Sequence, residues 1–348
     1  MSLEEIPAET VEFERVFFNM AYQTIQDLVE TLEIERLITV NGRLIVSSAT
    51  VAAARNLEIP VQLLESVNLV GDRYHIFDRS PHDLREMSEA QEKLWSTFGN
   101  LREVESQSYL DNRYGERLLA QSSKEYDFSQ QFELESHHGK LASFFPTTET
   151  EFPVFSDFYT TSTFEASQQN AFKAFAKVAK DFDFDVIVRA HPQNSDFLNV
   201  EKSEDAIWRS LCSETGAEFI SASSRINSYD LVNKSDLCVT YCSSIGIEAV
   251  LMGRPLLVLG ESDYSEYMPK NQGFTVEGIR KFLETEVPLI PVSNLYPWAL
   301  WQSKGGIALQ LFKVDPGWKL NYDGKRVDQA RIWYQILKNI ARMLRILN

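Results

Sequence analysis

The residues best suited to chemistry lie in the stretch LCVTYCSSIGIEAVLMGRPLLVLG, residues 237–260. Its pattern predicts a strand, a serine-rich turn at Ser243 and Ser244, a short helix and a second strand. Gly246 keeps the first turn of that helix open. Free backbone amides, the helix dipole and two hydroxyl groups all suit an anion. The stretch therefore predicts a phosphate or pyrophosphate site.

Glu248 lies one turn into the same predicted helix and allows two interpretations. A carboxylate placed directly on a phosphate would repel it, so the functional interpretation is an acceptor of hydrogen bonds from sugar hydroxyls, such as a ribose diol. The structural interpretation is an acid stabilised by the positive end of the helix dipole. The sequence leaves both open.

A second candidate is VIVRAHPQ, residues 186–193, in which an apolar strand ends in Arg189, His191 and Pro192. Pro192 cannot continue a strand ladder, and ligands of parallel sheets bind beyond the carboxyl ends of the strands. His191 could donate a hydrogen bond to a phosphate oxygen or a proton to a leaving group. The alternative is a strand-end histidine that bonds to a backbone carbonyl.

A third candidate is FFPTTETEF, residues 144–152, where a predicted strand runs into a polar turn that contains Glu151. A solvated loop explains this composition equally well. The turn gains interest because it would open on the same edge of the predicted sheet as the two stretches above.

Weaker candidates stand at two predicted strand ends in the N-terminal part of the chain. Asn41 and Arg43 belong to the NGR tripeptide, and Glu65 ends the next strand. Glu65 could act as a general base that faces a cleft. An exposed acid at a strand end is the simpler interpretation.

Hydrophobic periodicity predicts the elements that must position these residues. In the first part we expect helices at 10–35 and 48–57, strands at 37–40 and 61–65, and long polar helices within 82–125, interrupted by the turn-prone DNRYG. From residue 141 we expect strands at 141–145, 185–190, 217–220, 237–241 and 255–259, which alternate with helices at 164–181, 204–214, 228–234, 245–252 and 277–286. This alternation predicts a parallel, doubly wound sheet.

The predicted helix at 164–181 has the clearest signature of these elements. Ser162 and Glu165 have the spacing of a capping box. One apolar stripe follows at helical spacing, formed by Phe172, Phe175, Ala176, Ala179 and Phe182. We therefore expect this helix to cover one face of the sheet.

Composition excludes several classes of protein. The formal net charge of −16 repels phosphate backbones and argues against nucleic-acid binding. Three cysteines give no disulfide framework and fit a reducing cytoplasm. The N-terminus lacks a secretory signal, and no apolar run is long enough to span a membrane. The spacing of the Cys and His residues gives no metal site.

The tail from about Lys325 has the pattern of a basic amphipathic helix. Its apolar side consists of Ala330, Trp333, Leu337, Ile340 and Leu344. It could close the fold by packing on the domains, or it could bind weakly to an anionic membrane surface.

Together, R-x-H-P at a strand end and S-S-x-G-x-E-A-x-x-x-G-R-P at 243–255 resemble bacterial capsule and surface-polysaccharide glycosyltransferases of GT-B type, including the Kdo transferases. NGR, IPVQLLES at 59–66 and FDRSPHDL at 77–84 resemble the acceptor-side half of such proteins. The resemblance covers roughly residues 35–310 of the chain. It implies nucleotide contacts from Arg189, His191 and Pro192, and phosphate contacts from Ser243, Ser244 and Gly246. It further implies a ribose contact from Glu248 and acceptor-side roles for Glu65, Asn41, Arg43 and Glu151.

The resulting prediction is an α/β, GT-B-like fold with two Rossmann-like halves, the first reduced or truncated. We expect an acceptor-side domain at 1–140, a nucleotide-sugar domain at 141–315 and a closing helix at 316–348. The expected function is sugar transfer from a nucleotide sugar to an oligosaccharide or lipid-linked acceptor. No cofactor, metal or nucleic acid is expected, and the location is cytoplasmic, with peripheral membrane contact through the closing helix. Alternatives are a glycerophosphotransferase, a nucleotide-sugar epimerase or a catalytically silent assembly protein that binds a nucleotide sugar.

Overall fold

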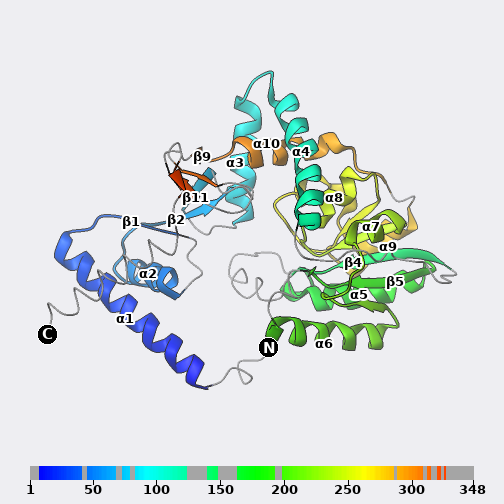
Figure 1. Ribbon diagram of the computed structural model, residues 1–348, viewed down its shortest axis with the longest axis horizontal. Helices are drawn as coiled ribbons and strands as arrows, with labels where there is room; N and C mark the ends of the chain where they lie inside the picture. The colour runs from blue at the N-terminus through cyan, green and yellow to red at the C-terminus, as the bar shows by residue number, and fades with distance from the viewer. Residues whose placement is uncertain are drawn as a thin grey trace. The chain divides into compact units, whose positions relative to one another are not determined.

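A computed structural model of the protein shows two compact units (Figure 1). It describes residues 8–40, 45–67, 73–78, 83–123, 139–147, 163–192, 198–285, 288–308, 312–314, 320–322 and 325–326. Unit 1 comprises Met1–Val11 and His82–Leu300, and unit 2 comprises Glu12–Pro81 and Trp301–Asn348.

A five-stranded parallel sheet forms the centre of unit 1. Its strands are β4 (Lys140–Phe145), β5 (Phe184–Arg189), β6 (Glu218–Ile220), β7 (Leu237–Thr240) and β8 (Leu256–Val258). Their order across the sheet is β6-β5-β4-β7-β8, and every neighbouring pair is parallel. The prediction of a parallel, doubly wound α/β sheet is confirmed, and all five predicted strands are present.

Helices cover both faces of this sheet, as Figure 1 shows. One face carries α5 (Gln168–Lys180), α6 (Leu198–Thr215) and α9 (Val276–Glu284), and the other carries α7 (Ser228–Lys234), α8 (Ile245–Leu251) and part of α4 (Arg102–Ser123). Within β5, Val186 and Val188 belong to the first layer and Ile187 to the second. Burial on both faces explains why the strands are continuous apolar runs.

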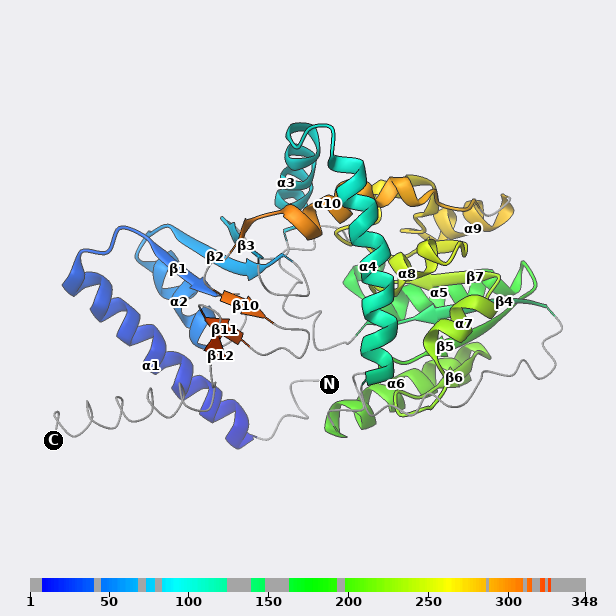
Figure 2. The same ribbon diagram turned by 45° about the horizontal axis from the view of Figure 1, so that its top comes forward.

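The predicted boundaries at 140 and 315 differ from the division into units. The helices α3 (Leu84–Thr97) and α4 belong to unit 1 together with the parallel sheet. Leu110 of α4 is fully buried in the same core layer as the sheet residue Cys238. Figure 2 shows α4 lengthwise in front of α8. This packing is long-range in sequence, so the local pattern did not indicate it.

Two local predictions in unit 1 are wrong. The sequence DNRYG lies inside α4 and forms no turn, because tertiary packing at Leu110 and Arg113 outweighs the weak local preference of Asp, Asn and Gly. Helix α5 begins at Gln168 and not at 164, with Ser167 as its N-cap accepting a hydrogen bond from the Asn170 amide at 3.2 Å.

The segment before α5 is a separate 3₁₀ turn, Thr163–Ala166, in which Phe164 and Glu165 have positive φ values of 52° and 57°. These angles cannot continue an α-helix, so Glu165 is not part of a capping box, and Ser162 lies outside the described residues. The predicted apolar stripe is confirmed for Phe172, Phe175, Ala176 and Ala179, which are buried. Phe182 lies after the end of α5 and is half-buried.

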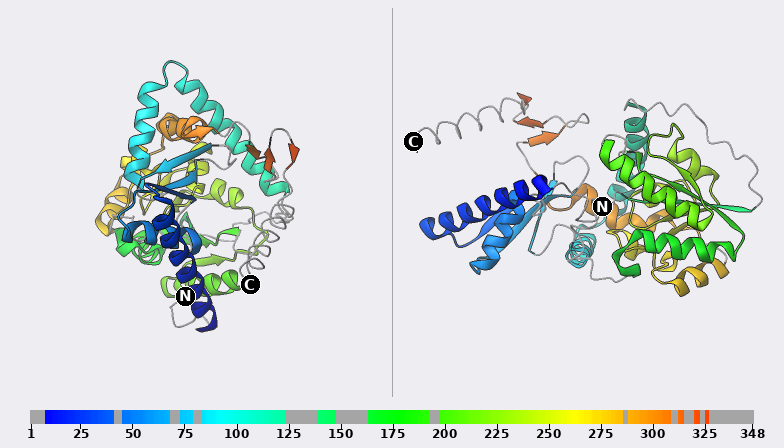
Figure 3. Two further views of the ribbon diagram at one scale, coloured as in Figure 1. Left: turned by 90° about the vertical axis from the view of Figure 1, so that its left-hand side faces the viewer. Right: turned by 90° about the horizontal axis from the view of Figure 1, so that it is seen from below.

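Unit 2 contains a four-stranded mixed sheet of order β1-β2-β3-β9. Its elements are α1 (Ala8–Leu32), β1 (Leu37–Val40), α2 (Ile45–Asn56), β2 (Val61–Ser66), β3 (Arg73–Phe77) and β9 (Ile307–Ala308). The β1 and β2 strands pair parallel, whereas β2–β3 and β3–β9 pair antiparallel. In the described part of this unit, the Rossmann-like pattern is limited to the β1-α2-β2 step. Both views in Figure 3 show α1 beside α2.

Helix α10 (Tyr296–Lys304) leads from unit 1 into unit 2, where a second small sheet follows. It consists of β10 (Phe312–Val314), β11 (Leu320–Tyr322) and β12 (Lys325–Arg326), paired antiparallel. The predicted closing helix at 316–348 is wrong at its start, because Leu320–Tyr322 and Lys325–Arg326 are strands that pair with each other. The rest of the predicted tail helix, 327–348, lies outside the described residues. No helix in the described ranges is long and apolar enough to cross a membrane.

Candidate functional site

The carboxyl edge of the parallel sheet brings the sequence motifs together. Strands β5, β4 and β7 are neighbours, and they lead into Arg189–Pro192, Pro146–Thr147 and Tyr241–Ser244, respectively. From β4 the chain adds β5 and β6 on one side and then β7 and β8 on the other. Such a switch point, here between β4 and β7, is where open parallel sheets bind ligands. The prediction that the motifs share one edge is confirmed.

The serine turn after β7 has a fixed backbone. Ser243 is buried, and its carbonyl oxygen accepts hydrogen bonds from the Tyr264 hydroxyl at 2.7 Å and the Gly246 amide at 3.1 Å. Ser244 is the N-cap residue of α8, and its carbonyl accepts from the Ile247 amide at 3.0 Å. Its side chain makes no capping hydrogen bond. The two predicted hydroxyls therefore stand on a turn that the backbone and Tyr264 hold.

The sequence suggested that Gly246 keeps the first turn of α8 open, but the structure shows that close packing against Tyr264 and Leu256 requires a glycine here. A Cβ atom at this position would lie 2.7 Å from the Tyr264 hydroxyl oxygen and 3.2 Å from a Leu256 methyl carbon. Tyr264 is almost fully buried, and burial raises the pKa of its hydroxyl well above the usual value. Tyr264 is therefore a supporting residue that the sequence did not reveal, since its contact with the turn spans 21 residues.

Glu248 faces a buried arginine. Its carboxylate is 3.5 Å from the Nη2 atom of Arg113 on α4, and the two side chains are only 2% and 4% exposed. The guanidinium of Arg113 also lies over the Trp298 ring, 5.2 Å from its centroid. Trp298 in turn donates a hydrogen bond to Asp263 at 2.8 Å, and burial raises the pKa of that carboxyl. The ribose contact of Glu248 stays a prediction. Neither interpretation from the sequence included Arg113 as a partner of this carboxylate.

Arg189 is a structural side chain in this fold. It is 1% exposed and donates hydrogen bonds to the carbonyl oxygens of Ser221, Ser224 and Ile226, the latter two at 3.3 Å. Burial lowers its pKa to about 10. Its guanidinium thus holds the loop after β6, and a contact with a nucleotide stays a prediction.

His191 and Pro192 follow directly at the same edge and are both half-buried. The backbone leading to them is fixed by a hydrogen bond from the Ala190 amide to the Ile220 carbonyl at 3.0 Å. The imidazole therefore belongs to a well-supported strand end, and its catalytic role stays a prediction.

Gln168 supports the start of the loop after β4. Its side-chain amide donates to the Thr147 carbonyl at 2.9 Å and accepts from the Thr147 amide at 3.1 Å. Gln168 is buried, so these bonds fix where the loop leaves the edge. The sequence did not single it out, because a glutamine at a helix start has no distinctive pattern. Glu151 lies outside the described residues.

The acceptor-side candidates belong to unit 2. Glu65 is half-buried in β2, where its carboxylate accepts a hydrogen bond from the Ser66 amide at 2.9 Å and its position pairs with His75 of β3. Asn41 and Arg43 lie outside the described residues. The general-base role of Glu65 stays a prediction.

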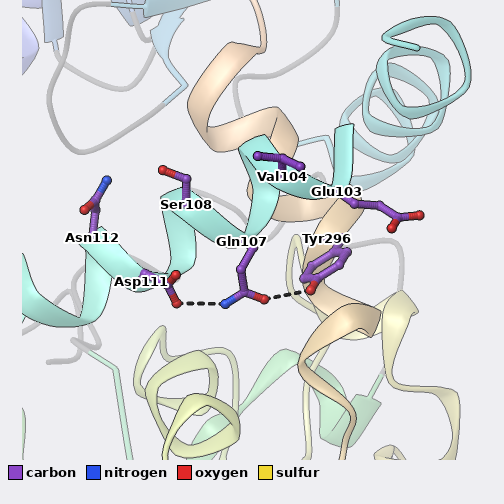
Figure 4. Close-up of a pocket in the computed structure, with 7 residues that line it drawn as sticks. All are labelled: Glu103, Val104, Gln107, Ser108, Asp111, Asn112 and Tyr296. Atoms are coloured by element: carbon purple, nitrogen blue, oxygen red, sulfur yellow. Dashed lines mark hydrogen bonds between the residues drawn. The ribbon is translucent and has the colours of Figure 1, made fainter. Parts of the chain in front are cut away.

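A separate surface pocket of about 550 Å³ lies on α4 and the start of α10 (Figure 4). The Tyr296 hydroxyl donates to Gln107 at 2.7 Å, and Gln107 donates to Asp111 at 2.7 Å. The remaining lining residues are Glu103, Val104, Ser108 and Asn112. None of the predicted site residues lines this pocket. Within the described ranges, no group of three or more His, Cys, Asp or Glu side chains is placed to hold a metal ion.

A family model described as capsule polysaccharide biosynthesis protein matches residues 94–275, more than half of the chain. The chain belongs to this family. The match lies within unit 1 and includes both the Arg-x-His-Pro and the Ser-Ser stretches. The resemblance seen in the motifs is therefore confirmed for the family, while the roles of the individual motif residues stay predictions.

Several solved structures are similar to the chain at low sequence identity. KpsC from Thermosulfurimonas dismutans, described as a beta Kdo 2,4 transferase, is 13% identical, with 86% of each chain covered and a TM-score of 0.49. The beta Kdo 2,7 transferase of KpsC from the same organism is 15% identical over 96% of this chain and 97% of that one, with a TM-score of 0.48.

The UDP-GlcNAc 2-epimerase from Neisseria meningitidis bound to UDP-GlcNAc is 13% identical over 92% of this chain and 81% of that one, with a TM-score of 0.32. Among curated protein sequences, none matches the chain. At these levels of identity and TM-score, the structural likenesses do not assign an activity.

Proposed function

We propose that this capsule polysaccharide biosynthesis protein is a glycosyltransferase that moves a sugar from a nucleotide-activated donor to a growing surface polysaccharide or glycolipid. One observation carries the proposal: the family match lies within the unit in which both motifs stand at one edge of a parallel sheet, at the ends of β5 and β7 on either side of β4. Polysaccharide synthesis requires glycosidic bond formation, and the switch point of a parallel sheet suits a nucleotide.

In the proposed reaction, the bond between the anomeric carbon of the sugar and the donor phosphate oxygen breaks and a bond from that carbon to an acceptor oxygen forms. The hydroxyls of Ser243 and Ser244 bind the donor phosphate. His191 stabilises the negative charge of the departing phosphate by a hydrogen bond or a proton. The support is positional, since β5 and β7 flank β4 and carry these residues to one edge.

Arg189 and Glu248 contribute to this site through the backbone that each one holds. The bonds of Arg189 to three carbonyls fix the loop after β6. The Arg113–Glu248 contact fixes α8 directly after the serine turn. Because the backbone around them is held in this way, the serine hydroxyls and the His191 imidazole need little rearrangement when the phosphate departs. Direct contacts of Arg189 with the nucleotide and of Glu248 with the ribose remain part of the proposal.

The acceptor is an oligosaccharide or a lipid-linked saccharide, and its hydroxyl loses a proton during transfer. We assign this proton to a carboxylate, with Glu65 as the first candidate and Glu151 as the second. Asn41 and Arg43 are the candidates for orienting the acceptor. The proposal retains a metal-independent reaction, in which the serine turn and His191 supply the charge stabilisation.

The test is a transfer assay with the full-length protein and a panel of CMP-, UDP-, GDP- and CDP-activated donors. We expect acceptor-dependent nucleotide release from one donor class, unchanged by EDTA. His191→Ala should lower the rate by about 10²–10⁴-fold if the imidazole acts as an acid. The matched control is Arg280→Ala, an exposed residue of α9 that is paired with Asp181.

Three outcomes contradict parts of this account. Full activity in His191→Ala removes the assigned site. Loss of activity in EDTA removes metal independence. Conversion of a nucleotide sugar to its epimer without an acceptor replaces transfer by epimerisation.

A further inference from the structure

Helix α1 in unit 2 has an exposed apolar side. Val16, Phe17, Met20, Leu28 and Leu32 are between 42% and 63% exposed. At about 100° per residue, these five positions fall within about 160° of the helix circumference. Val29 lies outside this range and is buried. Exposed Thr24, Asp27 and Thr31 lie within the same range, so the apolar side chains form one group near each end of the helix. Exposed apolar groups of this kind are typical of a surface that binds a partner.

The charge of α1 restricts what this partner can be. Its sequence carries one base, Arg15, and five acids: Glu9, Glu12, Glu14, Asp27 and Glu30. Arg15 is engaged by Glu12 at 2.6 Å. An anionic membrane surface would repel a helix of this composition, so the charge favours a basic amphipathic partner.

The chain itself contains such a partner after β12. Residues 327–348 carry one acid, Asp328, and four bases: Arg331, Lys338, Arg342 and Arg345. The apolar residues of this segment stand at 330, 333, 337, 340 and 344, which is the alternating three- and four-residue spacing of a helix-packing seam. As a helix, these 22 residues would be about 33 Å long, close to about 37 Å for the 25 residues of α1.

We propose that residues 327–348 dock as an amphipathic helix on the exposed apolar side of α1. The surface on α1 is defined by Val16, Phe17, Met20, Leu28 and Leu32. Apolar burial provides the driving force, and the opposite net charges favour this pair over two copies of α1. The docked segment ties the C-terminal end of the described sequence to the first helix of unit 2.

The direct test places a photo-reactive benzoylphenylalanine at Met20 in the full-length protein. We expect a cross-link within one chain, and peptide mass spectrometry should locate it in 327–348. The control places the same group at Asn19, which is exposed and about 100° further round the helix. At Asn19 the cross-link should be lost. Capture of a second chain, or no product within 327–348, overturns the proposal.

A second measurement uses hydrogen exchange of the full-length protein and does not depend on cross-linking. Met20→Glu adds a charge in the middle of the apolar side and should speed exchange in 327–348. Asn19→Glu adds the same charge outside it and should leave that exchange unchanged. Equal effects of both substitutions contradict docking.

Lipid vesicles distinguish docking from membrane binding. With the tail docked, wild-type protein should not co-sediment with phosphatidylglycerol vesicles, whereas Met20→Glu should gain binding through the released tail. Wild-type binding through 327–348 overturns the proposal in favour of a membrane surface. None of these three measurements depends on transferase activity, so failure here would leave the proposed function standing.

Discussion

Each unit contains an arginine that holds three backbone carbonyl groups, but the surroundings of the two side chains differ. In unit 1, Arg189 is 1% exposed and bonds to carbonyls of the loop after β6. In unit 2, Arg73 is half-buried and bonds to the carbonyls of Lys304, Gly305 and Gly306, at 2.6, 2.7 and 3.2 Å. The same arrangement thus lies in a fully covered core in one unit and near solvent in the other.

This difference extends to the sheets. Core strand residues of unit 1, such as Ile187, Val239 and Leu257, are fully buried, whereas Ile38 and Val40 of β1 in unit 2 are more than half exposed. Helices cover both faces of the first sheet, and apolar side chains of the second unit remain uncovered in the described ranges. We therefore expect substitutions to cost more in unit 1 than equivalent substitutions in unit 2.

The largest effect is expected for Arg189→Met. Loss of the guanidinium leaves carbonyl oxygens at Ser221, Ser224 and Ile226 without this donor in a buried site. The free energy of unfolding should fall by about 3–5 kcal/mol, as for a broken buried charged contact. Urea denaturation of the full-length protein measures it. A loss below that of Arg73→Met would reverse the comparison of the two units.

Gly246→Ala should have the next largest effect, at about 1–3 kcal/mol, because the added methyl group meets the Tyr264 hydroxyl. Tyr264→Phe removes that oxygen, so the double variant should lose less stability than the sum of the single variants. A double-mutant cycle by denaturation measures this coupling. Strict additivity would mean that the turn relaxes freely and that Gly246 has no packing role.

Arg73→Met should cost less, about 1–2 kcal/mol, since water can reach the carbonyls that it leaves behind. The loss should appear in unit 2, as faster hydrogen exchange in β3 and β9, with the sheet of unit 1 unchanged. Faster exchange in β4 or β5 would show that the two units do not respond separately.

The smallest effect is a pH dependence at His75. Burial against Phe77 and Trp301 lowers the pKa of its imidazole below the usual value near 6.5. The folded state therefore favours the neutral ring, so stability is complete above the unfolded pKa and declines as the pH falls below about 6.5. His75→Phe should flatten that decline in denaturation midpoints between pH 5 and 8. An unchanged slope would assign the decline to other groups.

The sequence predicted the sheet of unit 1 well because its strands are covered on both faces and separated by clear helices. Parallel strands also place their carboxyl ends on one edge of the sheet. The alternation of strands and helices along the chain was therefore enough to predict that His191 and the serine turn share that edge. The supporting contacts could not be predicted. Arg113 meets Glu248, and Tyr264 meets Ser243, only after the chain has folded.

Unit 2 was harder to predict for a related reason. β9 has two residues and exists through its pairing with β3, more than 200 residues away in the sequence. Similarly, strand pairing at β12 overrode the helical pattern that begins at Lys325. Local periodicity has no access to such pairings.

The central claim is that the carboxyl edge of β5, β4 and β7 binds the nucleotide of a sugar donor. Thermal unfolding of the full-length protein with CMP, UDP, GDP and CDP tests it most directly, because a ligand that binds only the folded state raises the melting temperature. We predict a rise with one of the four nucleotides in the wild type and in Arg280→Ala, and loss of that rise in His191→Ala. No rise with any nucleotide, or an equal rise in His191→Ala, would contradict the account.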